Sequence, residues 1–155
     1  MTTYKKVRIL SLPEAAYLAG LIDGEGTITL TRKTKNANRT IAISISNTEL
    51  NLLTYSLEII GAGKIAPKRV TKANHTPAFI YQISGRQALI VIEQILPFLR
   101  SYKKERGMLL AKSYIQLTPR NGRYTEELAN ERELFIKKFF EIRPNENNSR
   151  GRVIS

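Results

Sequence analysis

Hydrophobic residues alternate with polar ones in four short segments of the chain and recur every three or four positions in five others. Alternation is typical of strands with one buried face, and the longer repeat is typical of amphipathic helices. The alternating segments predict strands over residues 27–32, 40–46, 64–70 and 78–84. The helical segments run from Ser11 to the glycines at 24 and 26, over 48–60, from Ser84 toward Pro97, and over 102–117 and 125–142. The predicted order is α-β-β-α-β-β-α followed by C-terminal helices, which is an α+β fold.

Helix-capping sequences mark where several of these elements begin and end. Ser11-Leu12-Pro13-Glu14 and Ser84-Gly85-Arg86-Gln87 have the spacing of a capping box, in which a serine and the residue three positions later bond to each other's backbone. Gly61-Ala62-Gly63 is a glycine-rich end for the second helix. The segment after Pro144 is polar and carries no periodicity. We therefore predict a single domain over residues 1–143 and a flexible tail over 144–155.

The alternating segments place polar side chains on one face of the predicted sheet. In the first strand Ile28 and Leu30 lie opposite a row of threonines, and in the second three isoleucines lie opposite Ser44 and Ser46. In the fourth strand the sequence FIYQIS, residues 79–84, has apolar residues at both parities. The pattern therefore predicts one buried and one polar face, but leaves open which side chains of the fourth strand join the polar one.

The chain is strongly basic, with 25 lysines and arginines against 13 acidic residues and a net charge of +12. Between residues 27 and 86 nine basic residues accompany two acidic ones, so the predicted strands and their loops carry the main positive surface. An acidic partner is expected, although a charged surface that only aids solubility gives the same composition.

Two absences in the composition narrow the classes of function. The chain has no cysteine and one histidine, which argues against disulfides, thiol chemistry, cysteine-ligated metals and a cage of histidines. No apolar run reaches 18 residues and no signal-peptide pattern opens the chain. We therefore expect no membrane contact and an intracellular protein that is not secreted, in a prokaryotic cytoplasm or an organelle.

The most specific segment is LAGLIDGEG, residues 18–26, at the end of the first predicted helix. Gly20 and Gly24 lie about one turn apart, with Ala16 a turn earlier, so one helix face is a groove of small residues suited to a second helix. Glu25 lies between two glycines, where a carboxylate and accessible backbone carbonyls could bind a hard divalent cation. The alternative is a helix pair packed within one chain, with acids that are merely solvated.

These nine residues resemble the signature of the LAGLIDADG homing endonucleases, with Gly24 and Glu25 in place of its second alanine and second aspartate. The resemblance implies an αββαββα fold with a saddle-shaped antiparallel sheet and C-terminal helices, covering about residues 13–117. One copy of the motif implies a homodimer whose motif helices pack across a two-fold axis. The interface residues implied by this packing are Ala16, Ala19, Gly20, Ile22, Asp23 and Gly24.

The resemblance also implies a chemistry, which is hydrolysis of both strands of a DNA duplex across the minor groove, leaving 3′ overhangs. Mg²⁺ is the implied cofactor, Mn²⁺ is expected to substitute for it, and Ca²⁺ is expected to support binding without cleavage. Glu25 is the implied metal ligand, helped by the Gly24 carbonyl. Asn47 and Lys103 match the positions of a water-orienting residue and a phosphate-stabilising lysine, for which Lys104 competes. Asn47 as an ordinary helix N-cap and Lys103 as a surface lysine remain open alternatives.

DNA recognition is expected to fall to the strands and their loops, because a curved, polar, cation-edged antiparallel ribbon fits the major groove. The predicted DNA contacts are Thr29, Thr31, Lys33, Lys35, Arg39, Ser44, Ser46, Lys64, Lys68, Arg69 and Lys72. A symmetric dimer would prefer a pseudo-palindromic site, with two half-sites in different major grooves. The resemblance further implies an origin in a mobile intron or intein.

Two other functions suit a protein of this kind. An RNA maturase would assist intron splicing, and a DNA-binding regulator would bind a palindrome without cutting it. Basicity does not separate these alternatives. An intact acid at Glu25, beside Asp23, favours cleavage, because neither alternative requires a metal-dependent nuclease.

Overall fold

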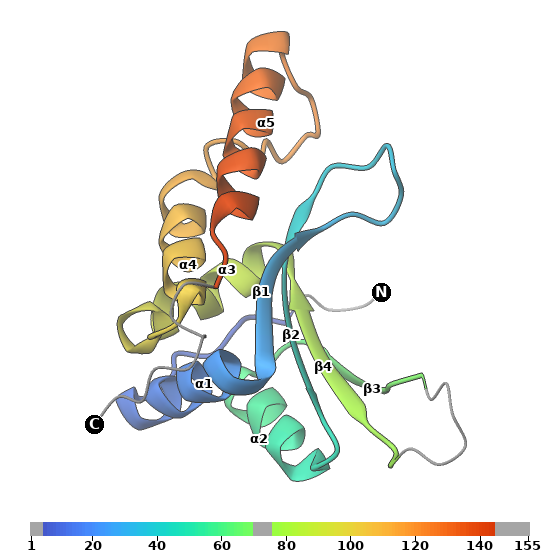
Figure 1. The fold of residues 1–155 in the computed structure, drawn as a ribbon, viewed down its shortest axis with the longest axis vertical. Coiled ribbons are helices and arrows are strands. Elements are labelled where there is room, and N and C mark those ends of the chain that lie inside the picture. The colour runs from blue at the N-terminus through green and yellow to red at the C-terminus, as the bar shows by residue number, and fades with distance from the viewer. Residues whose placement is uncertain (1–4, 70–75, 145–155) are drawn as a thin grey trace, which may run out of the picture.

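A computed structural model describes residues 5–69 and 76–144 (Figure 1). Its elements, in chain order, are α1 Leu12–Glu25, β1 Gly26–Thr31, β2 Thr40–Asn47, α2 Leu50–Ile60, β3 Lys64–Pro67, β4 Phe79–Ser84, α3 Gly85–Ile95, the 3-10 turn η1 Leu96–Phe98, α4 Tyr102–Ser113 and α5 Glu126–Glu141. This order confirms the predicted α+β fold with C-terminal helices. Within the described residues, no helix combines the length and the apolar character that crossing a membrane requires.

The four strands form one antiparallel sheet in the order β1-β2-β4-β3. One face supplies the core with the isoleucines of β2, with Ile28 and Leu30 of β1, and with Tyr81 and Ile83 of β4. Figure 1 shows α1 and α2 lying against this side, and α4 and α5 rising beside the β1 edge. Among the described residues, no helix covers the opposite face, so the sheet presents it to the surroundings.

The register settles the face of β4 that the sequence left open. Gln82 and Ser84 are exposed, whereas Tyr81 and Ile83 are buried. Tyr81 is fixed by its hydroxyl, which donates to the Ala62 carbonyl at 2.6 Å, and burial raises the pKa of this phenol. The polar face therefore continues across β4 through its two polar residues.

Several predicted boundaries are wrong. β3 ends at Pro67 instead of residue 70, and α4 ends at Ser113 instead of residue 117. Ser84 precedes α3 but makes no capping hydrogen bond, so the second capping box is absent. Gly85 turns through φ 66°, and the Gln87 amide donates to the Lys5 carbonyl at 2.5 Å instead of folding back to Ser84. The first capping box is present at Ser11 and Glu14.

One hydrophobic cluster connects the sheet with all five helices, from Leu10 to Phe139. Phe135 and Phe139 of α5 are buried in it, so the C-terminal helix packs on the same core as the motif helix. All but the first residue of the tail predicted over 144–155, and the predicted DNA contact Lys72, lie outside the described residues.

Candidate functional site

The motif helix α1 ends at an exposed carboxylate. Glu25 is its last residue, and both Glu25 and Gly24 are exposed. Gly26 follows at once as the first residue of β1, where a Cβ atom would lie 2.9 Å from the Ile22 Cα atom and 3.1 Å from the Ser44 carbonyl oxygen. Only glycine fits so close to two backbones, which explains the last position of the motif.

One face of α1 has no partner among the described residues. A Cβ atom built at Gly20 or Gly24 would meet no atom within 4 Å. Ala16, one turn earlier, is also exposed. The described residues therefore do not form the helix pair within one chain that the sequence allowed as an alternative for this face.

The predicted interface was too wide. Ala19 and Ile22 are completely buried in the chain's own core, which leaves them no surface for a second copy. Helical geometry explains the error, because these residues lie on the side of α1 that packs on the sheet. Of the six predicted residues, Ala16, Gly20 and Gly24 lie on the open face.

The Asp23 carboxylate points into the protein and joins α1 to the start of α4. Its oxygens accept hydrogen bonds from the Arg100 amide at 2.8 Å, the Ser101 amide at 3.2 Å and the Ser101 hydroxyl at 2.5 Å. Burial raises the pKa of Asp23, but the hydrogen bonds from Ser101 and Arg100 outweigh it and hold this pKa below its usual range. Asp23 is therefore an ionised acceptor for the segment that leads into α4.

Lys103 of α4 adds hydrogen bonds to this junction by donating to the end of α1. Its Nζ atom donates to the carbonyls of Ile22 at 2.8 Å and Asp23 at 2.9 Å, in the last turn of α1. Burial lowers its pKa, and the nearby Asp23 partly opposes this effect. With 7% of its surface exposed, Lys103 is not the generic surface lysine that the sequence left open. The structure thus brings the predicted Lys103, which is far from the motif in the sequence, to the end of the helix that carries Glu25.

Asn47 lies at the end of β2, on the same side of the sheet as α1. Ile45 pairs with Gly26, so Asn47 stands two residues past the partner of the motif's last glycine. Its Oδ1 atom accepts from the Glu49 amide at 2.8 Å, while Glu49 itself is the N-cap of α2. Asn47 is therefore not the N-cap that the sequence allowed as an alternative.

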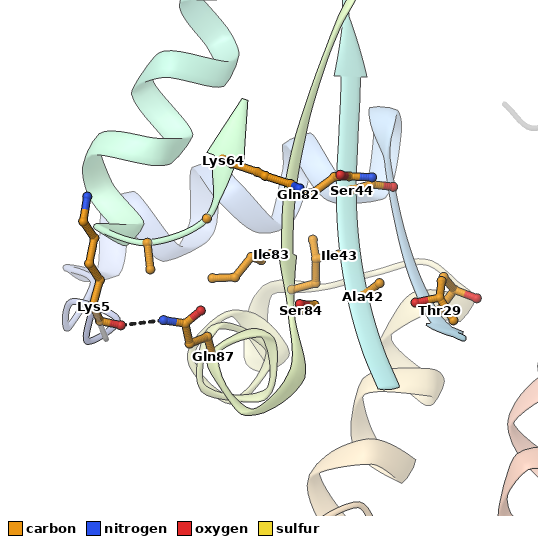
Figure 2. Close-up of a pocket in the computed structure, with 13 residues that line it drawn as sticks. Lys5, Thr29, Ala42, Ile43, Ser44, Lys64, Gln82, Ile83, Ser84 and Gln87 are labelled. Atoms are coloured by element: carbon orange, nitrogen blue, oxygen red, sulfur yellow. Dashed lines mark hydrogen bonds between the residues drawn. The ribbon is translucent and has the colours of Figure 1, made fainter. Parts of the chain in front are cut away.

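The open face of the sheet carries cross-strand rows in which most side chains are polar. Lys64 pairs with Gln82, and Gln82 with Ser44; Ser84 pairs with Ala42, and Ala42 with Thr29. Figure 2 shows both rows along a groove of about 800 Å³. Gln82 and Ser84 are not among the predicted DNA contacts, because the alternation in the fourth strand leaves open which of its two sets of side chains joins the polar face.

The other basic residues predicted to contact DNA differ in whether their side chains are exposed or bound within the protein. Lys33, Lys35, Lys68 and Arg69 are exposed. Arg39 instead turns toward the protein, where its guanidinium donates to the Leu30 carbonyl at 3.1 Å and lies 5.1 Å from the centre of the Phe140 ring. Arg39 is therefore not the free loop cation that the sequence predicted.

The described residues of one chain do not by themselves complete a metal site. No group of three histidine, cysteine, aspartate or glutamate residues within 5–69 and 76–144 is placed to hold a metal ion. The residues suited to the task are the exposed Glu25 carboxylate and the Gly24 carbonyl, at the negative end of a helix dipole.

Comparison with known proteins identifies the family. Residues 18–116, more than half of the chain, match the LAGLIDADG endonuclease family. The chain therefore belongs to the LAGLIDADG endonucleases, a family of metal-dependent nucleases that includes DNA-bound homing endonucleases. A search of curated protein sequences found no match.

Solved structures share the fold at low sequence identity. The homing endonuclease I-CvuI, in complex with its target in the presence of Ca, has a TM-score of 0.67 at 19% identity, over 92% of this chain and 87% of that one. The archaeal intron-encoded homing endonuclease I-Vdi141I, complexed with DNA, has a TM-score of 0.57 at 12% identity, over 84% of both chains. The group I intron-encoded I-CeuI, also complexed with DNA, has a TM-score of 0.52 at 17% identity, over 94% of this chain and 72% of that one.

Proposed function

We propose that the protein is a homodimeric homing endonuclease that hydrolyses both strands of a pseudo-palindromic DNA site across the minor groove and leaves 3′ overhangs. The observation that carries this proposal is the exposed Glu25 at the end of a helix whose Gly20 and Gly24 face is open. A catalytic acid and an unpaired helix face at one place are what half of a two-fold enzyme needs.

A second copy packed on this face would bring two Glu25 carboxylates to the dyad. Two negative charges at close range repel each other strongly unless cations lie between them. Dimer formation and cation binding would then support each other, and the two chains together would supply the ligands that one chain lacks. The exposed carboxylate and the Gly24 carbonyl fit Mg²⁺, which prefers oxygen ligands.

The chain's own residues would divide the work around the scissile phosphate. Bound Mg²⁺ would lower the pKa of an attacking water and stabilise the charge that develops on the phosphate. Glu25 would hold the ion, and Lys103 would keep the end of α1 in place while adding positive charge near the leaving oxygen. The Asn47 side chain would orient the water from the neighbouring strand end.

The polar face of the sheet would read bases in the major groove. Thr29, Thr31, Ser44 and Ser46 offer hydroxyls, and Gln82 offers an amide suited to adenine. Lys64 stands at the outer end of the same row and suits guanine or a phosphate. Lys33, Lys35, Lys68 and Arg69 would bind the phosphate backbone, which adds affinity without sequence preference.

Sequencing of cut and bound DNA tests this proposal directly. The protein is incubated with a randomised duplex library in Mg²⁺, and in parallel in Ca²⁺, and both cut ends and bound molecules are sequenced. We expect cutting at one pseudo-palindromic site with 3′ overhangs. Specific binding in Ca²⁺ without cutting in Mg²⁺ would instead indicate a regulator, and neither binding nor cutting would overturn the proposal in favour of an RNA partner.

Gly20→Leu is expected to disrupt the dimer and to spare the fold of one chain. The new side chain projects from the open face, where nothing lies within 4 Å, and leucine favours a helix more than glycine does. Overpacking of a close helix contact costs about 1–3 kcal/mol, which weakens association about 5- to 150-fold. Sedimentation measures the dimer constant, with Ala111→Leu on the exposed side of α4 as the control. Equal dimer constants in both variants would exclude this face.

A further inference from the structure

Three arginines join the outer edge of the sheet to the C-terminal helices. We name Arg39, Arg106 and Arg132, together with Phe140, the hairpin brace. Arg39 ends the loop between β1 and β2, Arg106 belongs to α4, and Arg132 and Phe140 belong to α5. β1 is the first strand in the sheet order, so one of its sides has no neighbouring strand.

Side chains of the hairpin brace take the place of that missing strand. The Arg106 guanidinium donates to the Ile28 carbonyl at 3.0 Å, and the Arg39 guanidinium donates to the Leu30 carbonyl at 3.1 Å. These carbonyls are two residues apart and therefore point to the same side of β1. The unpaired edge is thus held by two charged donors along the strand that leads into the β1–β2 loop.

Both arginines are held in turn by the C-terminal part of α5. Arg106 donates through Nε to the Ile142 carbonyl at 3.0 Å and lies 4.7 Å from the centre of the Phe139 ring. Arg39 lies over the Phe140 ring at 5.1 Å. A guanidinium over an aromatic face is attracted by the electrons of the ring, so each arginine binds β1 and α5 at once.

Arg132 fixes the other end of the loop. It is 4% exposed, and its guanidinium donates to the Leu117 carbonyl at 2.7 Å, the Thr118 hydroxyl at 2.6 Å and the Arg39 carbonyl. The Arg39 carbonyl belongs to the residue just before β2, so α5 holds the loop where it re-enters the sheet. A planar fork with several donors is the side chain best suited to such a junction.

The β1–β2 loop and α5 are not closely packed against each other. A cavity of about 380 Å³ lies between the loop and α5, lined by Asn38, Arg39, Tyr124, Arg132 and Ile136 among others. The direction in which the loop projects therefore depends on the few directed contacts of the hairpin brace. Figure 1 shows the loop extending away from the sheet beside α5.

We propose that α5 sets base recognition at the outer end of each half-site without touching DNA itself, by fixing the direction of the β1–β2 loop. This inference rests on the proposed function, because it assumes that Lys33 and Lys35 anchor the loop on the phosphate backbone and so position Thr31, the last residue of β1, to read a base. β1 runs from Gly26 beside Glu25 to Thr31 at the loop, a distance of about 17 Å at 3.4 Å per residue. At 3.4 Å per base pair, the loop lies about five base pairs from the site of cleavage.

Phe140→Leu tests the hairpin brace while keeping an apolar side chain of similar size against the core. The control is Leu134→Ala, an exposed position on the same helix. Base preferences are measured by sequencing library DNA bound in Ca²⁺, and the cleavage rate is measured in Mg²⁺ at saturating enzyme. We expect base preference at positions about five or more base pairs from the cleavage site to fall about tenfold, the worth of one base contact, with inner preferences and the saturated rate unchanged.

Hydrogen exchange supplies a readout that needs no DNA. Amides of residues 32–39 should exchange faster in Phe140→Leu and in Arg132→Lys than in the wild type. In the control Leu134→Ala they should exchange at the wild-type rate. A uniform loss at all base positions, or loop exchange equal to that of the wild type, would overturn the inference. Failure of the proposed function itself would be distinct, because the wild-type protein would then show no base preference at any position.

Discussion

Glu25→Gln should abolish DNA cleavage in Mg²⁺ and leave specific binding in Ca²⁺ nearly intact. The amide keeps the size of the side chain but removes the negative charge that would hold the cation at the end of α1. Metal stabilisation of a transition state is worth several kcal/mol, so the single-turnover rate should fall at least about 1000-fold. The polar face of the sheet lies on the other side of β1 and β2 and is unaffected by the change.

Two further variants serve as controls for Glu25→Gln. Glu25→Asp restores the acid of the family signature with one methylene less, and should retain cleavage with altered metal dependence. Glu141→Gln removes the same charge from an exposed position on α5 and should cleave at the wild-type rate. Normal cleavage by Glu25→Gln would show that the metal is held elsewhere.

The fold followed from the sequence where local chemistry decides structure. Alternation alone put Ile28, Ile43 and Ile45 on the buried face, because a strand turns successive side chains to opposite sides. Glycines at Gly24 and Gly61 marked the ends of α1 and α2 almost to the residue. These signals depend on a few neighbouring residues, so no knowledge of the rest of the chain was needed.

The fourth strand and the basic residues could not be assigned in the same way. Gln82 reaches the polar face because β4 pairs with β2 at Ser44, a register set by residues far away in sequence. Lys103 and Arg39 looked like cations for phosphates, yet both donate to backbone carbonyls, those of Asp23 and Leu30 respectively. Hydrogen-bond partners that tertiary packing brings together from distant parts of the chain produce no local pattern in the sequence.

The junction between α1 and α4 was the least predictable part of the site and the one that sets the position of Glu25. The resemblance to the family signature placed Asp23 among the interface residues of the motif helix. In the structure its carboxylate accepts from Arg100 and Ser101, and its carbonyl accepts from Lys103. The start of α4 and the segment that leads into it thus bind both the side chain and the backbone of Asp23 at the end of the motif helix. These contacts keep Glu25 on a rigid element.

Asp23→Asn should destabilise the protein by about 2–3 kcal/mol near pH 7, since a carboxylate accepting several hydrogen bonds gains more than a neutral amide. The asparagine amide group would also direct a donor toward one of the three donors from Arg100 and Ser101. Urea unfolding of both proteins measures the difference. Removal of an exposed acid in Glu141→Gln provides the comparison and should change stability little.

The same difference should depend on pH in a defined direction. The pKa of Asp23 is lower in the folded protein than in the unfolded chain, where aspartate titrates at about 3.9. Its contribution is therefore complete above this value and is lost as the pH falls through the lowered pKa of the folded state. Wild type and Asp23→Asn should approach each other in stability when unfolding is measured at about pH 3 and below, as the wild-type carboxylate takes up its proton. A gap that stayed constant down to that pH would mean that the Asp23 carboxylate does not act through its charge.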